Sequence, residues 1–401
     1  MVTDIRARDR TGLQSYGALF ASRHAKAFFA ASVPGRFGVA MTSLAVIVFT
    51  QTVVGSFAVA GLAASVLAIT NAVLAPVSAR LARRLGQPPV LAVSGITTAI
   101  AAVTMTVAGV ERNPFWLLAS VVLLGASMPQ IGAVAISRWT SLFQDPARLR
   151  TAFAVESVAT EVTFLAGPAI LSGAVALYGA AVAPGFAIGL IAVSALLLAG
   201  ARSSAPSPSP AGSHVTLRPG RALALVFAAS GCMGVFFGAS QVSVIASATA
   251  DGSAAIATAV YGTMSITSML SGFVYGVLRR PISRAAFDLA VAFTGLAVTS
   301  TLLVFAHDLL PLIVLLLIDG VFVAPAIINI GVLMQRDTPQ ARTHQTFTVL
   351  ASVQGLGVAL GAAAAGLLTD AIGATAGFAA PAVAAAAAIA LAAGARPRAL
   401  R

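Results

Sequence analysis

Residues 151–179 read TAFAVESVATEVTFLAGPAILSGAVALYG. The stretch is apolar and long enough to cross a bilayer as a helix, because about 20 residues at about 1.5 Å rise span the hydrocarbon core. It nevertheless contains two carboxylates, Glu156 and Glu161. An acidic residue near the middle of a spanning helix costs about 2.5–3.5 kcal/mol on translocon scales, so it is expected to face a partner, a cavity or a pathway. The stretch therefore predicts a membrane helix in which function is concentrated.

The composition of the whole chain is that of a membrane protein. Of its 401 residues, 58% are hydrophobic and 9% are charged, whereas ordinary globular chains are about 25% charged. Backbone groups in lipid must be hydrogen-bonded within their own segment, and the apolar runs are too long for barrel strands. We therefore predict an all-α polytopic membrane protein with twelve transmembrane helices, over approximately residues 28–50, 56–79, 88–109, 114–136, 152–177, 181–200, 221–247, 254–278, 285–306, 309–334, 346–368 and 373–394.

The positive charge of the chain follows the predicted topology. The net charge is +12, and 22 of the 24 basic residues lie in the two tails or after every second apolar run, the exceptions being Arg36 and Arg112. By the positive-inside rule this predicts an even number of spans in the plasma (inner) membrane, with both termini cytoplasmic. The charges are spread over seven segments, so we expect the lipid bilayer as a partner and no nucleic acid.

A linker divides the chain in its middle. Residues 201–220 are rich in Pro and Ser, which predicts a flexible cytoplasmic linker. It separates a six-helix bundle at 28–200 from a second at 221–394, with cytoplasmic tails at 1–27 and 395–401. The two bundles resemble each other at an offset near 196, as Pro129 against Pro325 illustrates. Paired repeats of this kind place a substrate site near the membrane midplane, between the halves.

Three stretches resemble a known family. Residues 79–91, ARLARRLGQPPVL, are similar to the G-x-L-A-D-R-x-G-R-K loop of the major facilitator superfamily, because Arg84 and Gly86 are kept. Arg83 stands where that family usually has Asp. Gly167-Pro168 resembles a signature of the drug/proton antiporter branch, and the small residues of 346–368 resemble the helix that relatives use opposite the fifth span. The chain is thus similar to a twelve-helix efflux permease with two pseudo-repeated six-helix bundles.

The resemblance implies a central cavity lined by the first, fourth, seventh and tenth spans, and a gating role for the loop with Arg83, Arg84 and Gly86. The residues expected at this mostly apolar cavity are Gln51, Gln130, Gln241, Phe236, Phe237 and Asn329. Such a lining favours a hydrophobic or amphipathic small molecule over a sugar.

The charges inside the spans are the candidates for coupling. Glu156 and Glu161 are five residues apart, which places them about 140° apart around a helix. Arg36 lies at a comparable depth in the first span, and a buried Arg beside a buried Glu offsets both desolvation costs. We predict that Arg36 pairs with one of them, with Glu161 favoured, and that the other binds and releases a proton. Asp319 is a further candidate for a proton or a cationic substrate; a purely structural role is the alternative for all four.

Proline and glycine mark expected irregularities and close contacts. We expect helix breaks at Pro129, at Gly167-Pro168 and at Pro325, which would allow bundles to rock. Gly357 and Gly361 predict close backbone approach of their helix to a neighbour.

Enzymatic functions lack the required residues. Lys26 is the only lysine, the four histidines are scattered, and Cys232 is the only cysteine. We therefore predict no catalytic residues, no metal site and no cofactor, with the proton as coupling ion.

We expect a secondary active transporter, acting as a monomer, that exports a small hydrophobic or amphipathic compound by proton antiport and alternating access. A sugar or metabolite exporter, an uncoupled facilitator, and a non-transporting sensor of transporter fold remain as alternatives.

Overall fold

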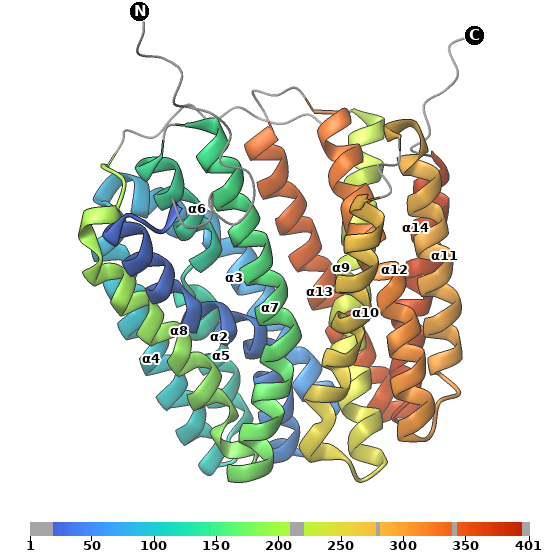
Figure 1. Ribbon diagram of the computed structural model, residues 1–401. Helices are drawn as coiled ribbons and strands as arrows, with labels where there is room; N and C mark the ends of the chain where they lie inside the picture. Colours follow the sequence, from blue (N-terminus) through green and yellow to red (C-terminus); the bar gives the residue numbers. More distant parts are fainter. Residues whose placement is uncertain (1–18, 144, 209–219, 278–280, 339–342, 395–401) are drawn as a thin grey trace, which may run out of the picture.

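The computed structural model describes residues 19–143, 145–208, 220–277, 281–338 and 343–394 as two groups of helices lying side by side (Figure 1). The N-terminal half contains α2 Arg23–Val54, α3 Phe57–Leu85, α4 Gln87–Val110, α5 Pro114–Ser127, α6 Ile131–Leu142, α7 Pro146–Tyr178 and α8 Ala183–Gly200. The C-terminal half contains α9 Arg221–Ala250, α10 Ala257–Val277, α11 Ala285–Leu303, α12 Leu309–Arg336, α13 Thr343–Ile372 and α14 Ala379–Gly394.

The predicted all-helical fold class is confirmed. Among the described residues, 11 helical segments are long and apolar enough to cross a membrane, and Ala376–Leu391 is a shorter apolar helix. The fourth of these segments consists of α5 and α6 together, and the shorter helix occupies the place of the twelfth predicted span. The first helix begins at Arg23 rather than at residue 28.

A helix is interrupted at only one of the three predicted proline sites. The break at Pro129 is confirmed, because α5 ends at Ser127 and α6 begins at Ile131. The breaks predicted at Gly167-Pro168 and at Pro325 are wrong, since α7 and α12 continue through them. A proline removes one backbone hydrogen bond, and in a membrane bundle neighbouring polar side chains help to accommodate it. Polar side chains bond beside both prolines: Thr258 donates to the Pro168 carbonyl at 2.9 Å, and Asn329 donates to the Pro325 carbonyl at 2.8 Å. The carbonyls that lose their helical N–H partner are those of Phe164 and Val321, one turn before each proline.

The two ends of the bundle differ in what they carry. We call the end with residues 85–87, 145–146, 200–208 and 220–221 the linker end, and the opposite end, with residues 55–56, 111–113 and 373–378, the distal end. The linker end is uppermost in Figure 1. Of the predicted linker, residues 202–204 form a short 3₁₀ turn in which Ser204 is buried, and residues 209–219 lie outside the described part.

Glycine brings two helices of the C-terminal half into backbone contact. A Cβ added at Gly234 or Gly238 of α9 would meet the carbonyl of Gln354 or Val358 in α13. Added at Gly361, it would meet the Val235 carbonyl. The predicted close approach of α13 to a neighbour is thus confirmed, and we call this contact the α9–α13 glycine seam.

The halves meet mainly through two helix pairs, α3 with α13 and α7 with α10, and α2 and α3 make smaller contacts with α9. The helix with the small residues, α13, therefore packs against α3 and α9. The expectation that it lies opposite the fifth span, α7, is wrong: its small residues are used by the glycine seam and by the α3 contact.

Candidate functional site

The first polar cluster lies inside the N-terminal half, near its linker end. Arg36 of α2 forms an ion pair with Glu156 of α7 through Nη2 and Oε2. The other carboxylate oxygen of Glu156 accepts from the Trp139 indole at 2.7 Å. Ser32 accepts from Arg36 Nε at 3.3 Å. Arg36 and Glu156 are both buried, so this cluster ties α2, α6 and α7 together without solvent.

The prediction that Arg36 pairs with a helix-5 glutamate is confirmed, but the preference for Glu161 is wrong. The reason is rotation around α7. Glu156 shares a face with Gly167, which packs against Met41 of α2, whereas Glu161 is turned about 140° away. Packing of α7 against α2 therefore selects Glu156.

Trp139 lies in an aromatic group that surrounds this cluster. Its ring contacts Phe28 edge-on at 4.6 Å between centroids and stacks with Phe143 at 5.9 Å. Both phenylalanines are buried, as is Trp139 itself. These rings fix the indole so that its N–H points at Glu156, and they keep water from the ion pair.

Glu161 lies on the face that α7 turns towards the other half. Leu165, Pro168 and Ser172 follow it at helical spacing. Ser172 donates to the Ala255 carbonyl at 2.7 Å, and Leu165 and Pro168 pack against Gly262 of α10. Glu161 is one turn nearer the linker end than Leu165, and its side chain is exposed. The described α7–α10 contacts thus run from Leu165 towards the distal end, and Glu161 is exposed one turn beyond them.

Asp319 is the buried carboxylate of the C-terminal half. Its side chain is fully buried in α12, and its Oδ1 accepts from the Thr299 hydroxyl of α11. Among the described residues, its Oδ2 has no hydrogen-bond partner. A buried carboxylate with one hydrogen bond is costly in its ionised form, and a bound proton removes that cost. Asp319 is thus suited chemically to hold a proton.

A chain of polar side chains leads from Asp319 to the other half. The buried Tyr261 of α10 lies near Asp319 and interacts with Gln241 of α9. Gln241 Oε1 in turn accepts from Ser43 of α2 at 2.6 Å. Asp319 is therefore separated by two side chains, those of Tyr261 and Gln241, from Ser43 of the other half.

The other residues expected at the cavity lie in several places. Gln130 follows the α5–α6 break and donates to Asn71 at 2.8 Å, inside the N-terminal half. Gln51 is partly buried near the distal end of α2. Phe236 is fully buried in the hydrophobic core, so the expectation that it lines the cavity is wrong, and Phe237 packs partly buried beside it.

Asn329 belongs to a second cluster near the linker end of the C-terminal half. It is buried, and its side chain donates to the Tyr275 hydroxyl at 2.8 Å. Tyr275 also donates to Asp288 at 2.8 Å. Asn329 therefore bonds within its own half, joining α12 to α10 and, through Tyr275, to α11.

The expected gating loop is almost entirely helical. Arg83 and Arg84 are exposed in the last turn of α3, and α4 begins at Gln87. Gly86 alone joins the two helices, with a φ of 88° that favours glycine. The retained glycine thus has a backbone reason, while a gating role for the arginines stays a prediction.

Two polar residues escaped the sequence interpretation. Arg138, counted there as a charge of the linker-end surface, is fully buried and donates to the Leu198 carbonyl at 2.7 Å, the Ala201 carbonyl at 2.9 Å and Ser204 at 2.9 Å. It therefore satisfies the carboxyl end of α8. Asp370, near the distal end of α13, bonds to the other half. Its signal in the sequence was an acid at the carboxyl end of the predicted span 346–368, where an acid is unfavourable.

Contacts between the halves lie towards the distal end. Ser65 of α3 donates to the Ala359 carbonyl of α13 at 2.6 Å, and the α7–α10 bonds described above lie at a similar depth. The α3–α13 contact reaches as far as Gly355, where an added Cβ would lie 3.3 Å from Ala72. The described cross-half contacts thus close the bundle at its distal end.

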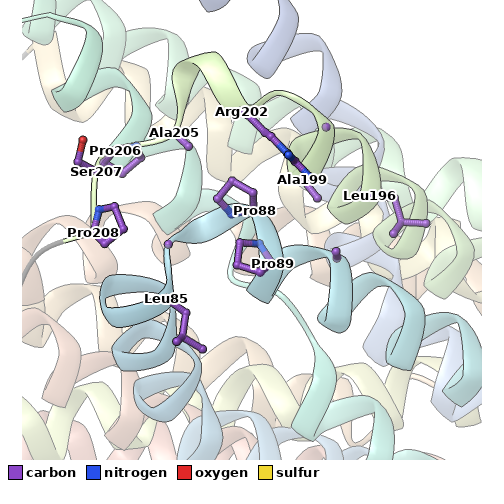
Figure 2. A pocket seen from close by; sticks show the side chains of 13 residues that line it. Leu85, Pro88, Pro89, Leu196, Ala199, Arg202, Ala205, Pro206, Ser207 and Pro208 are labelled. Atoms are coloured by element: carbon purple, nitrogen blue, oxygen red, sulfur yellow. The ribbon is translucent and has the colours of Figure 1, made fainter.

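A pocket of about 640 Å³ lies elsewhere, on the N-terminal half alone (Figure 2). Pro88 and Pro89 of α4 face Leu196 and Ala199 of α8 across it, and the start of the linker covers one side. The N-terminal half and the start of the linker line this pocket, so we assign it no part in a site between the halves.

Solved structures resemble most of the chain. Nucleoside transporter NupG is 16% identical and aligns over 93% of this chain and 98% of its own, with a TM-score of 0.68. The human organic anion transporter MFSD10 (TETRAN) is 15% identical over 92% of this chain and 100% of its own, with a TM-score of 0.63. Peptide transporter POT in complex with sulfate is 12% identical over 92% and 93%, with a TM-score of 0.68. The chain has the major facilitator fold.

At these identities the likeness concerns the fold alone. No protein-family model and no curated protein sequence matches the chain. The major facilitator fold accounts for the six-and-six division. Together with the 11 apolar helices found among the described residues, it makes the chain a multi-pass membrane protein.

Proposed function

We propose that this protein is a secondary transporter that moves a small hydrophobic or amphipathic compound across the membrane by alternating access. The observation that carries the proposal is that the two halves are in contact at the distal end. One turn nearer the linker end than the α7–α10 contact, Glu161 is exposed. One end state of a rocking cycle has this arrangement, in which a site between the halves opens towards the linker end. The transporters with similar structures support a small molecule as the substrate.

The surroundings of Glu161 favour an amphipathic compound. The α7–α10 pairing is antiparallel, with Leu165 beside Gly262, so Glu161 is level with Ile266. Ile266 and Met269 of α10 are 49% and 41% exposed. A carboxylate beside exposed apolar side chains can bind a molecule that carries both an apolar body and a positive charge, because the charge pairs with the carboxylate and the body covers the apolar side chains.

Asp319 supports proton coupling. Its second oxygen lacks a partner among the described residues. Tyr261 lies near both Asp319 and Gln241, and Gln241 accepts from Ser43 of the other half. Binding of a proton at Asp319 would remove a buried charge from the C-terminal half and change what this chain of side chains bonds to. We propose that this change alters the balance between the two end states.

The direction of transport follows from the basic residues. If the linker end faces the cytoplasm, as the positive-inside rule favours, the described state takes up its substrate from the cytoplasm. Exchange of that substrate for an external proton would then make the protein an exporter by antiport.

The proposal is tested with purified protein in liposomes that contain a pH-sensitive dye. Lipophilic cations and neutral lipophilic compounds are added, and the wild type is compared with Asp319→Asn, Glu161→Gln and the matched control Asp251→Asn, an exposed distal-end carboxylate. We expect compound-driven proton flux in the wild type and the control. Asp319→Asn should abolish proton flux, and Glu161→Gln should lower cation-driven flux at least tenfold while sparing neutral compounds.

Other outcomes would change the assignment. Compound movement without proton movement, indifferent to Asp319→Asn, would indicate an uncoupled facilitator. No flux of any compound, in protein that elutes as a single folded species, would favour the non-transporting alternative.

A further inference from the structure

Asp370 joins the two halves at the distal end. Its Oδ1 accepts from the backbone N–H of Phe57 at 2.9 Å. Its Oδ2 accepts from the N–H of Ala58 at 2.9 Å and from the Ser56 hydroxyl at 2.6 Å. The carboxylate of one half therefore caps the first turn of α3 in the other half.

The first turn of a helix has backbone N–H groups without partners inside the helix. In α3, Ser56 serves the Val59 N–H at 3.2 Å, and Asp370 serves the two N–H groups before it. A carboxylate at this position also interacts favourably with the positive end of the helix dipole. The cap of α3 is complete only while the halves touch.

The same aspartate is badly placed in its own helix. Asp370 lies in the last turn of α13, which ends at Ile372, and a negative charge there opposes the helix dipole. Its contacts with α3 offset this local cost. A residue that is unfavourable locally and favourable only across an interface indicates a role in that interface.

Among the residues that the structure describes, the distal contact between α7 and α10 shows no such charge. There the hydroxyl of Ser172 donates to the Ala255 carbonyl, and Thr258 donates to the Pro168 carbonyl. Both are neutral hydrogen bonds, which are weaker than charge-assisted ones. The ionic cap therefore distinguishes the α3–α13 contact from its counterpart.

We propose that Asp370 is a positioning residue that latches the distal end closed, and that its three bonds break each time the protein opens there. The inference rests on the proposed alternating access, because it names a residue that sets the balance between the end states. Beneath the latch, Gly366 packs on the Phe57 carbonyl and Gly61 on the Ala362 carbonyl, so the backbones already fit when the latch forms.

The latch is tested by measuring distances between spin labels in the full chain, reconstituted in lipid nanodiscs. With Cys232 replaced by Ser, labels at Glu111→Cys and Phe305→Cys report on the distal ends of the two halves. We expect Asp370→Ala to raise the ratio of long to short distances about five- to thirtyfold, as loss of a helix cap would. Labels at Arg84→Cys and Gln335→Cys should show the reciprocal shortening at the linker end.

Asp251→Ala is the matched control, because Asp251 is also exposed at the distal end but bonds within its own half, to Ser253 at 3.2 Å. Equal distance distributions in Asp370→Ala and the control would overturn the proposal. Should Asp370→Ala fail to fold, Asp370→Asn and Ser56→Ala take its place. Each must raise the long-distance fraction above that of the control, and the latch is refuted if neither does.

These distances are measured without substrate. They therefore test the latch even if no compound is transported. Transport together with unchanged distances would refute the latch and leave the proposed transport function standing.

Discussion

Replacing Glu156 by Gln removes the charge that Arg36 faces and leaves an amide oxygen in reach of the Trp139 indole. The side chains of Arg36 and Glu156 are 6% and 8% exposed, so solvent screens the pair little. Removal of one partner from a buried pair costs about 3–5 kcal/mol, because the other charge stays buried. We expect the lower end, about 3 kcal/mol, since Arg36 keeps its hydrogen bond to Ser32.

The loss is measured as the free energy of unfolding in detergent micelles with increasing denaturant. Glu161→Gln is the control, since an exposed side chain without a described partner should change that free energy by less than about 0.5 kcal/mol. The double variant Arg36→Met with Glu156→Gln should recover at least half of the loss, because it leaves no buried charge unpaired. If Glu156→Gln destabilised the protein no more than Glu161→Gln, the ion pair would not hold α2 and α7 together as described.

Three further predictions concern single contacts. Arg138→Leu should lower the free energy of unfolding by about 3 kcal/mol in the same assay, because it leaves buried acceptors at the end of α8 unpaired; Arg138→Lys should recover less than half of that. Gly61→Val would press on the Ala362 carbonyl of the other half. The distal spin-label distances should therefore lengthen, while the midpoint temperature of thermal unfolding stays the same. Gly238→Val would press on the Val358 carbonyl within one half, and we expect loss of the monodisperse peak in size-exclusion chromatography, with Gly185→Val, which meets open space, as control.

Hydropathy and charge predicted the fold because both act over whole segments. A span needs about 20 apolar residues whatever its neighbours are, and basic residues mark one end irrespective of packing. The ion pair was only half predictable. Arg36 needed a carboxylate, but the choice between Glu156 and Glu161 depends on how α7 rotates against α2, and Met41, Gly167 and the Trp139 indole from a third helix decide that rotation.

Arg138 and Asp370 were missed for another physical reason. Arg138 bonds to backbone carbonyls at the end of α8, and Asp370 bonds to backbone N–H groups at the start of α3. No side-chain pattern in the sequence marks such backbone acceptors and donors. Prolines misled for a related reason. Pro168 and Pro325 remain inside continuous helices in a packed bundle, whereas Pro129 lies within a real break between Ser127 and Ile131.

The α9–α13 glycine seam has a mechanical consequence. Two helices whose backbones touch at Gly234, Gly238 and Gly361 cannot shift independently, so they form one stiff lever. One arm of this lever carries Gln241, and the other carries Asp370 at the distal end. A displacement of α9 beside Gln241 should therefore be transmitted through these backbone contacts to Asp370 at the end of α13.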